Sequence, residues 1–333
     1  MYFKMKLREK IFKFFRLVLC RFAYPPKDIT IEISTKCALK CRICFRFPLS
    51  INEKTMKWEL FKTILNKIKS EPRQNISYLN FVGLGEVFCH DRLLDVLKYT
   101  RELFPDISIN LSTSLVPFKE EVLKQIIEHG LVDQMNISLD DAQPCSEDFH
   151  PCTNETLNNI DRLLEMIHVS HSKMIVRFQG VLLSTEQVQR ILDFAKAKGV
   201  SFVHFIRMDL HAFKGETDLS RIGRAQEIQL MRWVRRYGKQ RDITVTHNNS
   251  FNIFMRIASH FDKYCLMTDD HMFIDVEGNV LPCFFLRKHV FGDLKHESLQ
   301  QIYARTPKLS FYSDQEVVCK GCDEYKENYH HKC

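Results

Sequence analysis

The chain has 333 residues, of which 45% are hydrophobic and 12 are cysteines. This size accommodates one large α/β domain with a small appendage, and the apolar content supports a substantial core. No run approaches the roughly 18 consecutive apolar residues of a membrane-spanning helix. Many cysteines without a secretory signal favour a reducing compartment, where thiols bind metal rather than form disulfides. We therefore expect a cytoplasmic location.

The net charge of +7 is concentrated at the amino end. Residues 1–22 carry seven Lys and Arg against one Glu, a net +6, so the rest of the chain is nearly neutral. A terminal patch of this kind does not indicate nucleic-acid binding. Apolar spacings of three and four predict an amphipathic helix here. This helix either lies on an anionic membrane surface, peripheral on its inner face, or closes the bottom of the main domain with a solvated basic face.

Short β-branched runs alternate with segments of helical period from residue 29 onward. The predicted strands are 29–34, 78–82, 107–111, 134–139, 173–178 and 201–206. The predicted helices are 56–69, 91–104, 119–129, 155–169, 185–198, 225–238 and 297–305. This alternation predicts right-handed βαβ crossovers and a parallel sheet, as a partial barrel or an open doubly wound sheet. In both architectures chemistry gathers at the carboxyl ends of the strands.

Three cysteines, Cys37, Cys41 and Cys44, follow the first predicted strand in the run ISTKCALKCRICF. A [4Fe–4S] cluster usually takes four Cys thiolates, so three close together leave one iron open for a substrate or cofactor. For the triplet by itself, a structural zinc knuckle and three unreactive buried thiols are the alternatives. The CxxxCxxC pattern resembles the radical S-adenosylmethionine (SAM) enzyme family, in which the open iron chelates the amino and carboxylate groups of SAM.

The loop after the second predicted strand resembles another motif of that family. The run Gly83-Leu84-Gly85-Glu86 is similar to the GGE motif, whose Glu binds the SAM amino group, with Leu84 replacing one of the paired glycines. Glycines allow the backbone to approach a ligand closely. The resemblance therefore implies cofactor contacts for Gly83, Gly85 and Glu86, although a simple turn is the alternative for such a short run.

Later strands carry further matches. The run Leu111-Ser112-Thr113-Ser114-Leu115 resembles the family's Thr-Asn-Gly segment, with Thr113 and Ser114 aligned to Thr and Asn and Leu115 in place of Gly. The resemblance implies cofactor contacts for Ser112 and Thr113. Ser138 and Asp140, in NISLD, resemble its Ser-x-Asp strand, which contacts the SAM ribose or carboxylate; strand-end caps are the alternative. The resemblance implies that Arg177 faces the SAM carboxylate, with an outward surface Arg as the alternative.

One position near the triplet departs from the family pattern. Ile43 stands where the family often has an aromatic residue for the adenine, and Phe45 is the candidate replacement. No role is assigned to the cysteines outside the two ligand sets. Among them are Cys89, Cys145, Cys152 and Cys333.

The C-terminal part contains a second set of cysteines. Two of them flank a predicted hairpin over 272–283, and the other two form a CxxC pair. Its members are Cys265, Cys283, Cys319 and Cys322. The set resembles the auxiliary-cluster extension of radical SAM enzymes in its shorter "twitch" form, with one extra [4Fe–4S] cluster. The full form, called SPASM, has two more cysteines, at the positions of Asn328 and Lys332. Four thiolates also suit zinc, which is the alternative for this set by itself.

The resemblance covers about residues 29–325 and implies a partial (β/α)6 TIM-like barrel with a small α+β auxiliary-cluster domain. The expected divisions are a basic helix over 1–24, the radical SAM core over 25–240 and the auxiliary domain over 241–333. The implied enzyme cleaves SAM reductively to a 5′-deoxyadenosyl radical and abstracts hydrogen from a substrate C–H bond. A net oxidation aided by the auxiliary cluster and an electron donor of the flavodoxin or ferredoxin type are also implied.

Three hypotheses remain for the substrate and role. The basic helix favours a membrane-proximal substrate, such as a lipid-linked sugar or an envelope polymer precursor. A peptide or protein substrate is second, because about 28 residues before the first strand do not fit the leader-peptide-binding domain of many peptide-modifying relatives. The third is a non-catalytic iron–sulfur or zinc protein, which would not need the loops of Glu86, Thr113 and Asp140.

Overall fold

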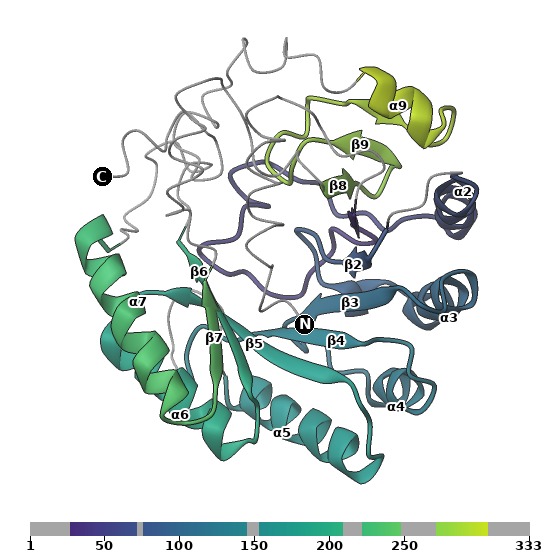
Figure 1. The fold of residues 1–333 in the computed structure, drawn as a ribbon. Helices are drawn as coiled ribbons and strands as arrows, with labels where there is room; N and C mark the ends of the chain where they lie inside the picture. The colour runs from purple at the N-terminus through teal and green to yellow at the C-terminus, as the bar shows by residue number, and fades with distance from the viewer. Residues whose placement is uncertain (1–26, 72–75, 145–152, 209–221, 248–270, 306–333) are drawn as a thin grey trace, which may run out of the picture.

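The computed structural model describes residues 27–71, 76–144, 153–208, 222–247 and 271–305. These residues form an α/β fold around one sheet with the strand order β10-β9-β8-β1-β2-β3-β4-β5-β6-β7. Strands β1 to β7 pair in parallel with their successive neighbours, and β8 adds in parallel to the other side of β1. Strands β9 and β10 continue the sheet in antiparallel pairs. The sheet is curved, with the helices along its outer side (Figure 1).

The elements alternate along the chain as the sequence predicts. The strands are β1 (Asp28–Ile31), β2 (Tyr78–Phe81), β3 (Ser108–Thr113), β4 (Gln134–Ser138), β5 (Ile175–Leu182), β6 (Phe202–Arg207), β7 (Thr244–His247), β8 (His271–Ile274), β9 (Asn279–Leu281) and β10 (Gly292–Asp293). The helices are α2 (Trp58–Lys69), α3 (Leu93–Leu103), α4 (Glu120–Glu128), α5 (Asn154–Val169), α6 (Thr185–Ala197), α7 (Arg224–Lys239) and α9 (Leu299–Arg305), with a short 3-10 helix η1 (Val87–Cys89). The predicted strands, helices and hairpin are confirmed, whereas β7 was not predicted.

Local signals determine where the helices start and stop. The Ser184 hydroxyl accepts a hydrogen bond from the backbone N–H of Gln187 at the start of α6, and Thr153 caps α5 in the same way. Gly130 and Gly199 follow α4 and α6 with φ angles of 57° and 71°. Only glycine adopts this left-handed conformation readily, so each helix ends there. Each helix therefore has a defined length, and the chain returns to the edge of the sheet where the next parallel strand begins.

The two faces of the parallel sheet differ in chemistry because successive side chains of a strand point to opposite faces. The outer face is apolar and packs on the helices; Phe178 of β5, for example, stacks on Phe194 of α6 with ring centroids 5.7 Å apart. The alternating positions on the inner face are mostly polar. They include Asn80, Asn110, Ser112, Gln134, Asn136, Arg177, Gln179, His204 and Thr246. The fold therefore encloses a polar surface inside the curve of the sheet.

A single sheet crosses the domain division expected at residue 240. Strand β7 lies beyond that residue yet pairs with β6, and β8 pairs with β1. The hairpin of β8 and β9 is thus an extension of the core sheet, and the division itself stays a prediction. Within the described ranges no helix is long and apolar enough to cross a membrane. The predicted basic helix over 1–24 lies outside the described residues.

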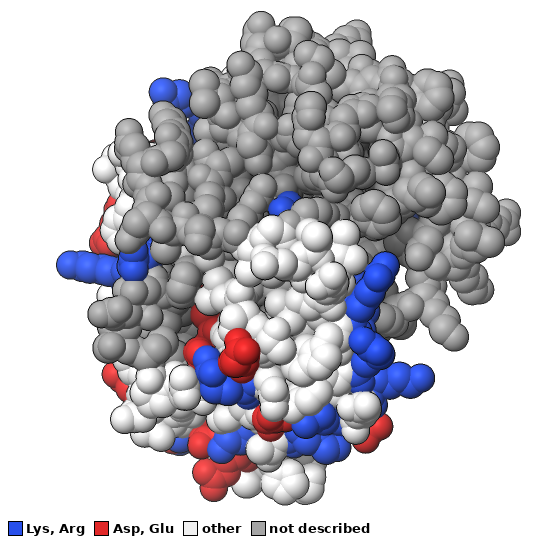
Figure 2. All heavy atoms as spheres, turned by 90° about the vertical axis from the view of Figure 1, so that its left-hand side faces the viewer, with Lys and Arg blue, Asp and Glu red and all other residues white. Residues whose placement is uncertain are grey.

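The charged side chains on the side of the molecule drawn in Figure 2 are of both signs. Lys, Arg, Asp and Glu of the described residues lie interspersed around an uncharged area. This mixture on the described part of that side does not favour a polyanionic partner.

Candidate active site

The cysteine triplet lies in the loop that follows β1, at the carboxyl edge of the sheet. Cys41 is buried, and Cys37 and Cys44 are partly exposed. The backbone N–H of Cys44 donates to the Cys41 carbonyl at 3.0 Å, and that of Leu39 donates to Cys37 Sγ at 3.4 Å. The loop thus holds three thiols in a short stretch of chain, with two of them open toward solvent or a ligand.

Burial makes two of these thiols harder to ionise than a free cysteine. Burial raises the pKa of Cys37 to about 11 and that of Cys41 to about 12, and the charges of Cys44 and Cys37 contribute to the second shift. Coordination to a metal deprotonates a thiol outright, whatever the pKa of the free thiol. No group of three His, Cys, Asp or Glu among the described residues suits a single ion. A four-iron cluster binds each thiolate through a different iron, and a set of soft thiolates fits it.

Arg46 holds this loop in place and was not singled out from the sequence. It is 6% exposed, and its guanidinium donates to the carbonyls of Thr35 at 3.1 Å and Leu39 at 3.0 Å. Its positive charge also opposes the rise in the pKa of Cys37. Charge-assisted hydrogen bonds of this kind fix both distance and orientation. The available signal was its position two residues after the last cysteine of the triplet.

The glycines of the loop after β2 are required by contacts of the chain with itself. A Cβ at Gly85 would lie 2.4 Å from the Ser34 carbonyl oxygen, and a Cβ at Gly83 would lie 2.3 Å from Glu32 Cγ. The close approach that these glycines allow is therefore between this loop and the chain leading into the cysteine loop. Their predicted contact with SAM stays a prediction.

Glu86 is a buried carboxylate surrounded by neutral donors. Its Oε1 accepts from Thr113 Oγ1 at 2.6 Å and from the Phe88 N–H at 3.2 Å, and its Oε2 accepts from Ser114 N and Oγ at 2.8 and 2.7 Å. Burial raises the pKa of Glu86 although these hydrogen bonds oppose the rise. No cation of the described residues pairs with it. A cationic ligand group would therefore be stabilised here.

The structure brings two of the predicted motifs together at this carboxylate. Thr113, at the end of β3, and Glu86, after β2, are in direct contact, as the shared sheet edge requires. Ser112 points to the other face of β3, where its hydroxyl accepts from Asn136 Nδ2 at 3.3 Å. Ser112 and Thr113 therefore cannot share one role, and only Thr113 lies beside Glu86.

Asp140 lies near the cysteine loop and also serves the sheet. It follows β4, is 4% exposed, and its Oδ1 accepts from the Val181 N–H at 2.8 Å. Its negative charge contributes to the raised pKa of Cys41, after burial and the charges of the two other cysteines. Ser138, the last residue of β4, is partly exposed and pairs in register with Gln179. The strand-end contact of Asp140 is confirmed, and its contact with SAM stays a prediction.

Arg177 lies on the inner face of β5 and is partly buried. Its Nη2 donates to Gln134 Oε1 at 3.1 Å, and its register partner on β4 is Asn136. Burial and the charge of Arg177 lower the pKa of His204 to about 4, so that imidazole is neutral near pH 7. Gln179 pairs with Ser138, the last residue of β4, and Arg177 lies two residues earlier on β5. It therefore belongs to the polar inner face, below the carboxyl edge.

A row of amide side chains on the inner face was missed from the sequence. Asn80, Asn110 and Gln134 are partners in register across β2, β3 and β4. Asn110 Nδ2 donates to Asn80 Oδ1 at 2.8 Å, and Gln134 Nε2 donates to Asn136 Oδ1 at 3.1 Å. The signal was present, because each of these strands carries a polar residue between two apolar ones.

Cys283 represents the auxiliary cysteine set among the described residues. It is 8% exposed and follows β9. Phe45, the candidate aromatic for adenine, packs edge-on against Phe285 of the same segment. The other members, Cys265, Cys319 and Cys322, lie outside the described residues, as do Cys145, Cys152 and Cys333. Cys89, in η1, lies near enough to contribute to the raised pKa of Cys37.

Two family models match the chain. Residues 31–206, just over half of the chain, match the Radical SAM superfamily, and residues 265–323 match the SPASM model, an iron–sulfur cluster-binding domain. A curated relative, the tungsten-containing aldehyde ferredoxin oxidoreductase cofactor-modifying protein of Pyrococcus furiosus, is 30% identical over 114 residues. That match spans 34% of this chain and 31% of the relative, so only about a third of each is compared.

Solved structures share the fold over most of the chain. Streptococcus suis SuiB bound to precursor peptide SuiA superposes with a TM-score of 0.68 at 16% identity, covering 96% of this chain and 74% of that one. The structure of anSMEcpe with bound AdoMet and the Cp18Cys peptide gives a TM-score of 0.64 at 16% identity, covering 90% and 86%. At this identity the likeness establishes the fold, here that of radical SAM enzymes.

The family match and the geometry agree. The radical SAM domain implies a [4Fe–4S] cluster and SAM as cofactors, with a reductant and a substrate, and the SPASM match supports auxiliary iron–sulfur clusters. The matched segment begins within β1, ends within β6, and contains the cysteine loop together with Glu86 and Thr113. The chain belongs to the radical SAM superfamily.

Proposed function

We propose that Cys37, Cys41 and Cys44 bind a [4Fe–4S] cluster and that Glu86 receives the amino group of SAM beside it. The buried carboxylate of Glu86, held by four neutral donors and no cation of the described residues, carries this proposal. The hydroxyl groups of Thr113 and Ser114 donate to Glu86 and have acceptor capacity for an ammonium group as well.

The remaining predicted residues complete this site. Ser138, at the end of β4, and Asp140, just after it, are the residues that we expect to contact the ribose or carboxylate of SAM. Arg177 and Ser112 line the inner face next to them, and Gly83 and Gly85 hold the Glu86 loop against the cysteine loop. When bound, the cluster would supply the electron that cleaves SAM, and the 5′-deoxyadenosyl radical so formed would abstract hydrogen from a substrate C–H bond.

The chain itself contributes position and protection from solvent. Arg46 fixes the cysteine loop through two carbonyls, so the three thiols keep one arrangement. The sheet curves around the inner face and its helices cover the outer side, so the inner face is shielded from solvent from behind (Figure 1). A flavodoxin- or ferredoxin-type protein is the electron donor that we expect.

For the C-terminal part we propose one auxiliary [4Fe–4S] cluster on Cys265, Cys283, Cys319 and Cys322, within a twitch-like domain over 241–333. An additional cluster that accepts electrons favours a net oxidation of the substrate. The buried position of Cys283 is consistent with a ligand role. Zinc on the same four thiolates is the alternative.

We favour a peptide or protein as the substrate. The solved structures of similar fold include one bound to a precursor peptide and one bound to a Cys-containing peptide. The inner face of this chain presents amides, which match the hydrogen-bonding groups of a peptide backbone. A membrane-proximal substrate reached through residues 1–22 is the second candidate, supported by the basic composition of that segment.

The test is anaerobic reconstitution followed by a SAM cleavage assay. We expect about eight irons per chain, as two four-iron clusters require. Dithionite and SAM should then yield methionine and 5′-deoxyadenosine. Zinc in place of iron, or iron without SAM cleavage, would support the non-catalytic scaffold instead.

A matched pair of variants identifies the cluster ligands. Cys41→Ala should lose about four irons and all 5′-deoxyadenosine formation. Cys89→Ala removes a partly buried thiol near the same loop but outside the triplet, so it should retain both. Full SAM cleavage by Cys41→Ala would contradict the proposed assignment.

A further inference from the structure

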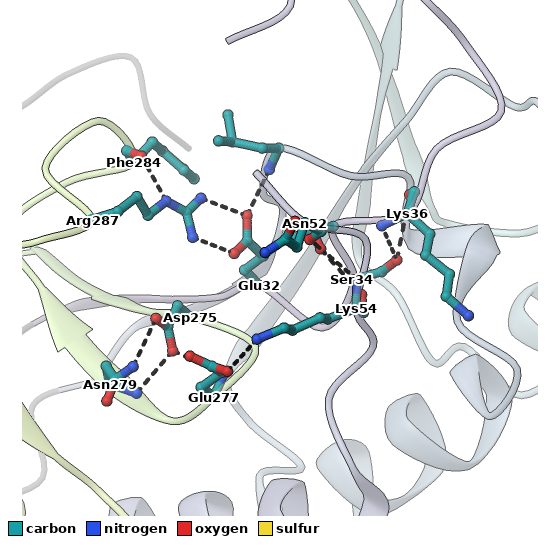
Figure 3. A network of polar contacts seen from close by, with 12 residues as sticks. Glu32, Ser34, Lys36, Asn52, Lys54, Asp275, Glu277, Asn279, Phe284 and Arg287 are labelled. Carbon is teal, nitrogen blue, oxygen red and sulfur yellow. Dashed lines mark hydrogen bonds and ion pairs between the residues drawn. The ribbon is translucent and has the colours of Figure 1, made fainter. Parts of the chain in front are cut away.

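A buried ion pair joins the strand that leads into the cysteine loop to the segment that carries Cys283. Glu32, directly after β1, is 1% exposed, and its carboxylate faces the Arg287 guanidinium (Figure 3). Arg287 Nη1 lies 2.6 Å from Glu32 Oε2, and Nη2 lies 2.8 Å from Oε1. Two parallel contacts of this kind fix orientation as well as distance.

Each member of the pair also binds a further backbone segment. The Leu84 N–H, in the loop ahead of Glu86, donates to Glu32 Oε1 at 2.8 Å. Arg287 Nε donates to the carbonyl of Phe284, the residue after Cys283, at 2.8 Å. The pair therefore connects three segments, each of which carries a residue of the proposed cluster or SAM site.

An aromatic contact links two of these segments independently. Phe45 directly follows Cys44, and Phe285 lies two residues after Cys283. Their rings meet edge-on, with centroids 4.6 Å apart and planes at 79°. Aromatic pairs favour this arrangement. The two cysteine segments are thus held together by one polar and one apolar contact.

Stability alone does not account for an ion pair whose Glu32 and Arg287 side chains are 0% and 16% exposed. The loss of hydration of two charges offsets most of their attraction, and well-packed apolar side chains often serve as well. A surface pair shows the contrast: Lys54 and Glu277 also join the core to the β8–β9 turn, at 2.6 Å, but their side chains are 48% and 52% exposed. What Glu32 and Arg287 add is a defined orientation.

We propose that Glu32 and Arg287 are positioning residues that hold the Cys283 segment at one place relative to the cysteine loop, so that the two iron–sulfur clusters keep a defined separation. This inference rests on the proposed ligand roles of Cys44 and Cys283. The pair acts through the segments it holds and contacts no reacting atom.

The first test is amide hydrogen exchange on the full-length reconstituted protein. Arg287→Gln and Glu32→Gln should each speed exchange over residues 283–287 by about tenfold or more, since local opening becomes easier. Glu277→Gln, which breaks the exposed pair at the same junction, should leave exchange there at the wild-type rate. Unchanged exchange over 283–287 in Arg287→Gln would overturn the proposal.

The second test is electron paramagnetic resonance of the dithionite-reduced protein. Two reduced clusters are paramagnetic, and each shortens the spin relaxation of the other according to their separation. The microwave power at half-saturation should shift in Arg287→Gln and remain unchanged in Glu277→Gln. Loss of the auxiliary iron together with faster exchange would also support the proposal. A saturation curve identical to that of the wild type would overturn it.

The double variant E32Q/R287Q decides the matter if Arg287→Gln does not fold. It removes both charges; Glu32→Gln keeps the shape of the side chain, and Arg287→Gln shortens it. Wild-type exchange and wild-type saturation in the double variant would show that the ion pair only fills space, which would overturn the proposal. Hydrogen exchange requires neither SAM nor substrate, so this failure is distinct from a wild-type protein that does not cleave SAM, which would refute the proposed function.

Discussion

Glu32 and Glu86 are both buried carboxylates at the carboxyl edge of the sheet, 1% and 4% exposed, yet their surroundings differ. Glu32 meets the two nitrogens of a guanidinium. Glu86 meets two backbone N–H groups and two hydroxyl groups, and burial raises its pKa. A buried charge with an ionic partner is neutralised within the fold, whereas one held only by dipoles is suited to a cationic ligand.

The comparison distinguishes a residue that positions segments from a residue that binds a cofactor, which the sequence alone does not. Both residues follow strands in the same sheet; Glu32 accepts from the N–H of Leu84 in the loop of residues 83–86, and Glu86 ends that loop. Only the identity of the partner distinguishes a residue that positions segments from one that binds a cofactor. Substitutions that remove the charge at each site therefore test the distinction.

The largest expected effect on stability is that of Arg287→Gln. It leaves Glu32 buried without its cation, so the free energy of unfolding should fall by about 3–5 kcal/mol. Urea denaturation of the wild type and the variant measures this difference. The double variant E32Q/R287Q should be less destabilised than Arg287→Gln, because it leaves no buried charge without its partner. A double variant as unstable as the single one would contradict the assigned ion pair.

Glu86→Gln should mainly weaken the binding of SAM. A hydrogen bond to a charged group contributes about 1.5–3 kcal/mol, so the dissociation constant should rise about 10- to 100-fold. Equilibrium dialysis with the reconstituted protein measures it, and Glu277→Gln is the control. Unchanged affinity would show that Glu86 only supports the loop.

The pH dependence of SAM binding gives a second test of Glu86. Because burial raises the pKa of Glu86, its carboxylate gains a proton at a higher pH than an exposed Glu. Wild-type affinity for SAM should therefore fall as the pH decreases through that raised pKa, before an ordinary carboxyl of pKa 4.5 would titrate. Glu86→Gln should lack this dependence. Parallel pH profiles for the two proteins would argue against contact between Glu86 and the ammonium group.

Thr113→Val should have a smaller effect. The hydroxyl donates to Glu86 and accepts from the Leu115 N–H, at 2.6 and 2.8 Å. Losing both contacts should lower the free energy of unfolding by about 1–2 kcal/mol. Thr113→Ser retains the hydroxyl and is the control. Thermal denaturation compares the three proteins, and equal losses in the Val and Ser variants would implicate packing instead.

Glu277→Gln should change the free energy of unfolding least, by less than about 1 kcal/mol, because its pair with Lys54 is exposed and screened by salt. Urea denaturation at low and high salt checks both statements. A loss as large as that of Arg287→Gln would remove the contrast between the buried and the exposed pair.

The predicted strands were recovered where period and turn signals coincide. Strand β5 runs to Leu182, beyond the predicted 173–178, because Gly180 interrupts the apolar pattern while the tertiary packing needs no side chain there; a Cβ would lie 2.5 Å from the Leu139 carbonyl. Strand β7 was missed because TVTH is short and largely polar. It joins the sheet through pairing with β6, which no local pattern records.

The sequence by itself determined the chemistry available at each loop: three thiols after the first strand, a Gly-rich run ending in Glu86 after the second, and hydroxyl groups after the third. These follow from neighbours along the chain, where strand period and turn residues act directly. Only the tertiary structure decided the partners. Glu86 is near Thr113 because adjacent parallel strands end together, and Glu32 meets Arg287, 255 residues away, because β8 docks on β1. Such pairings depend on packing between distant segments, which local propensity does not specify.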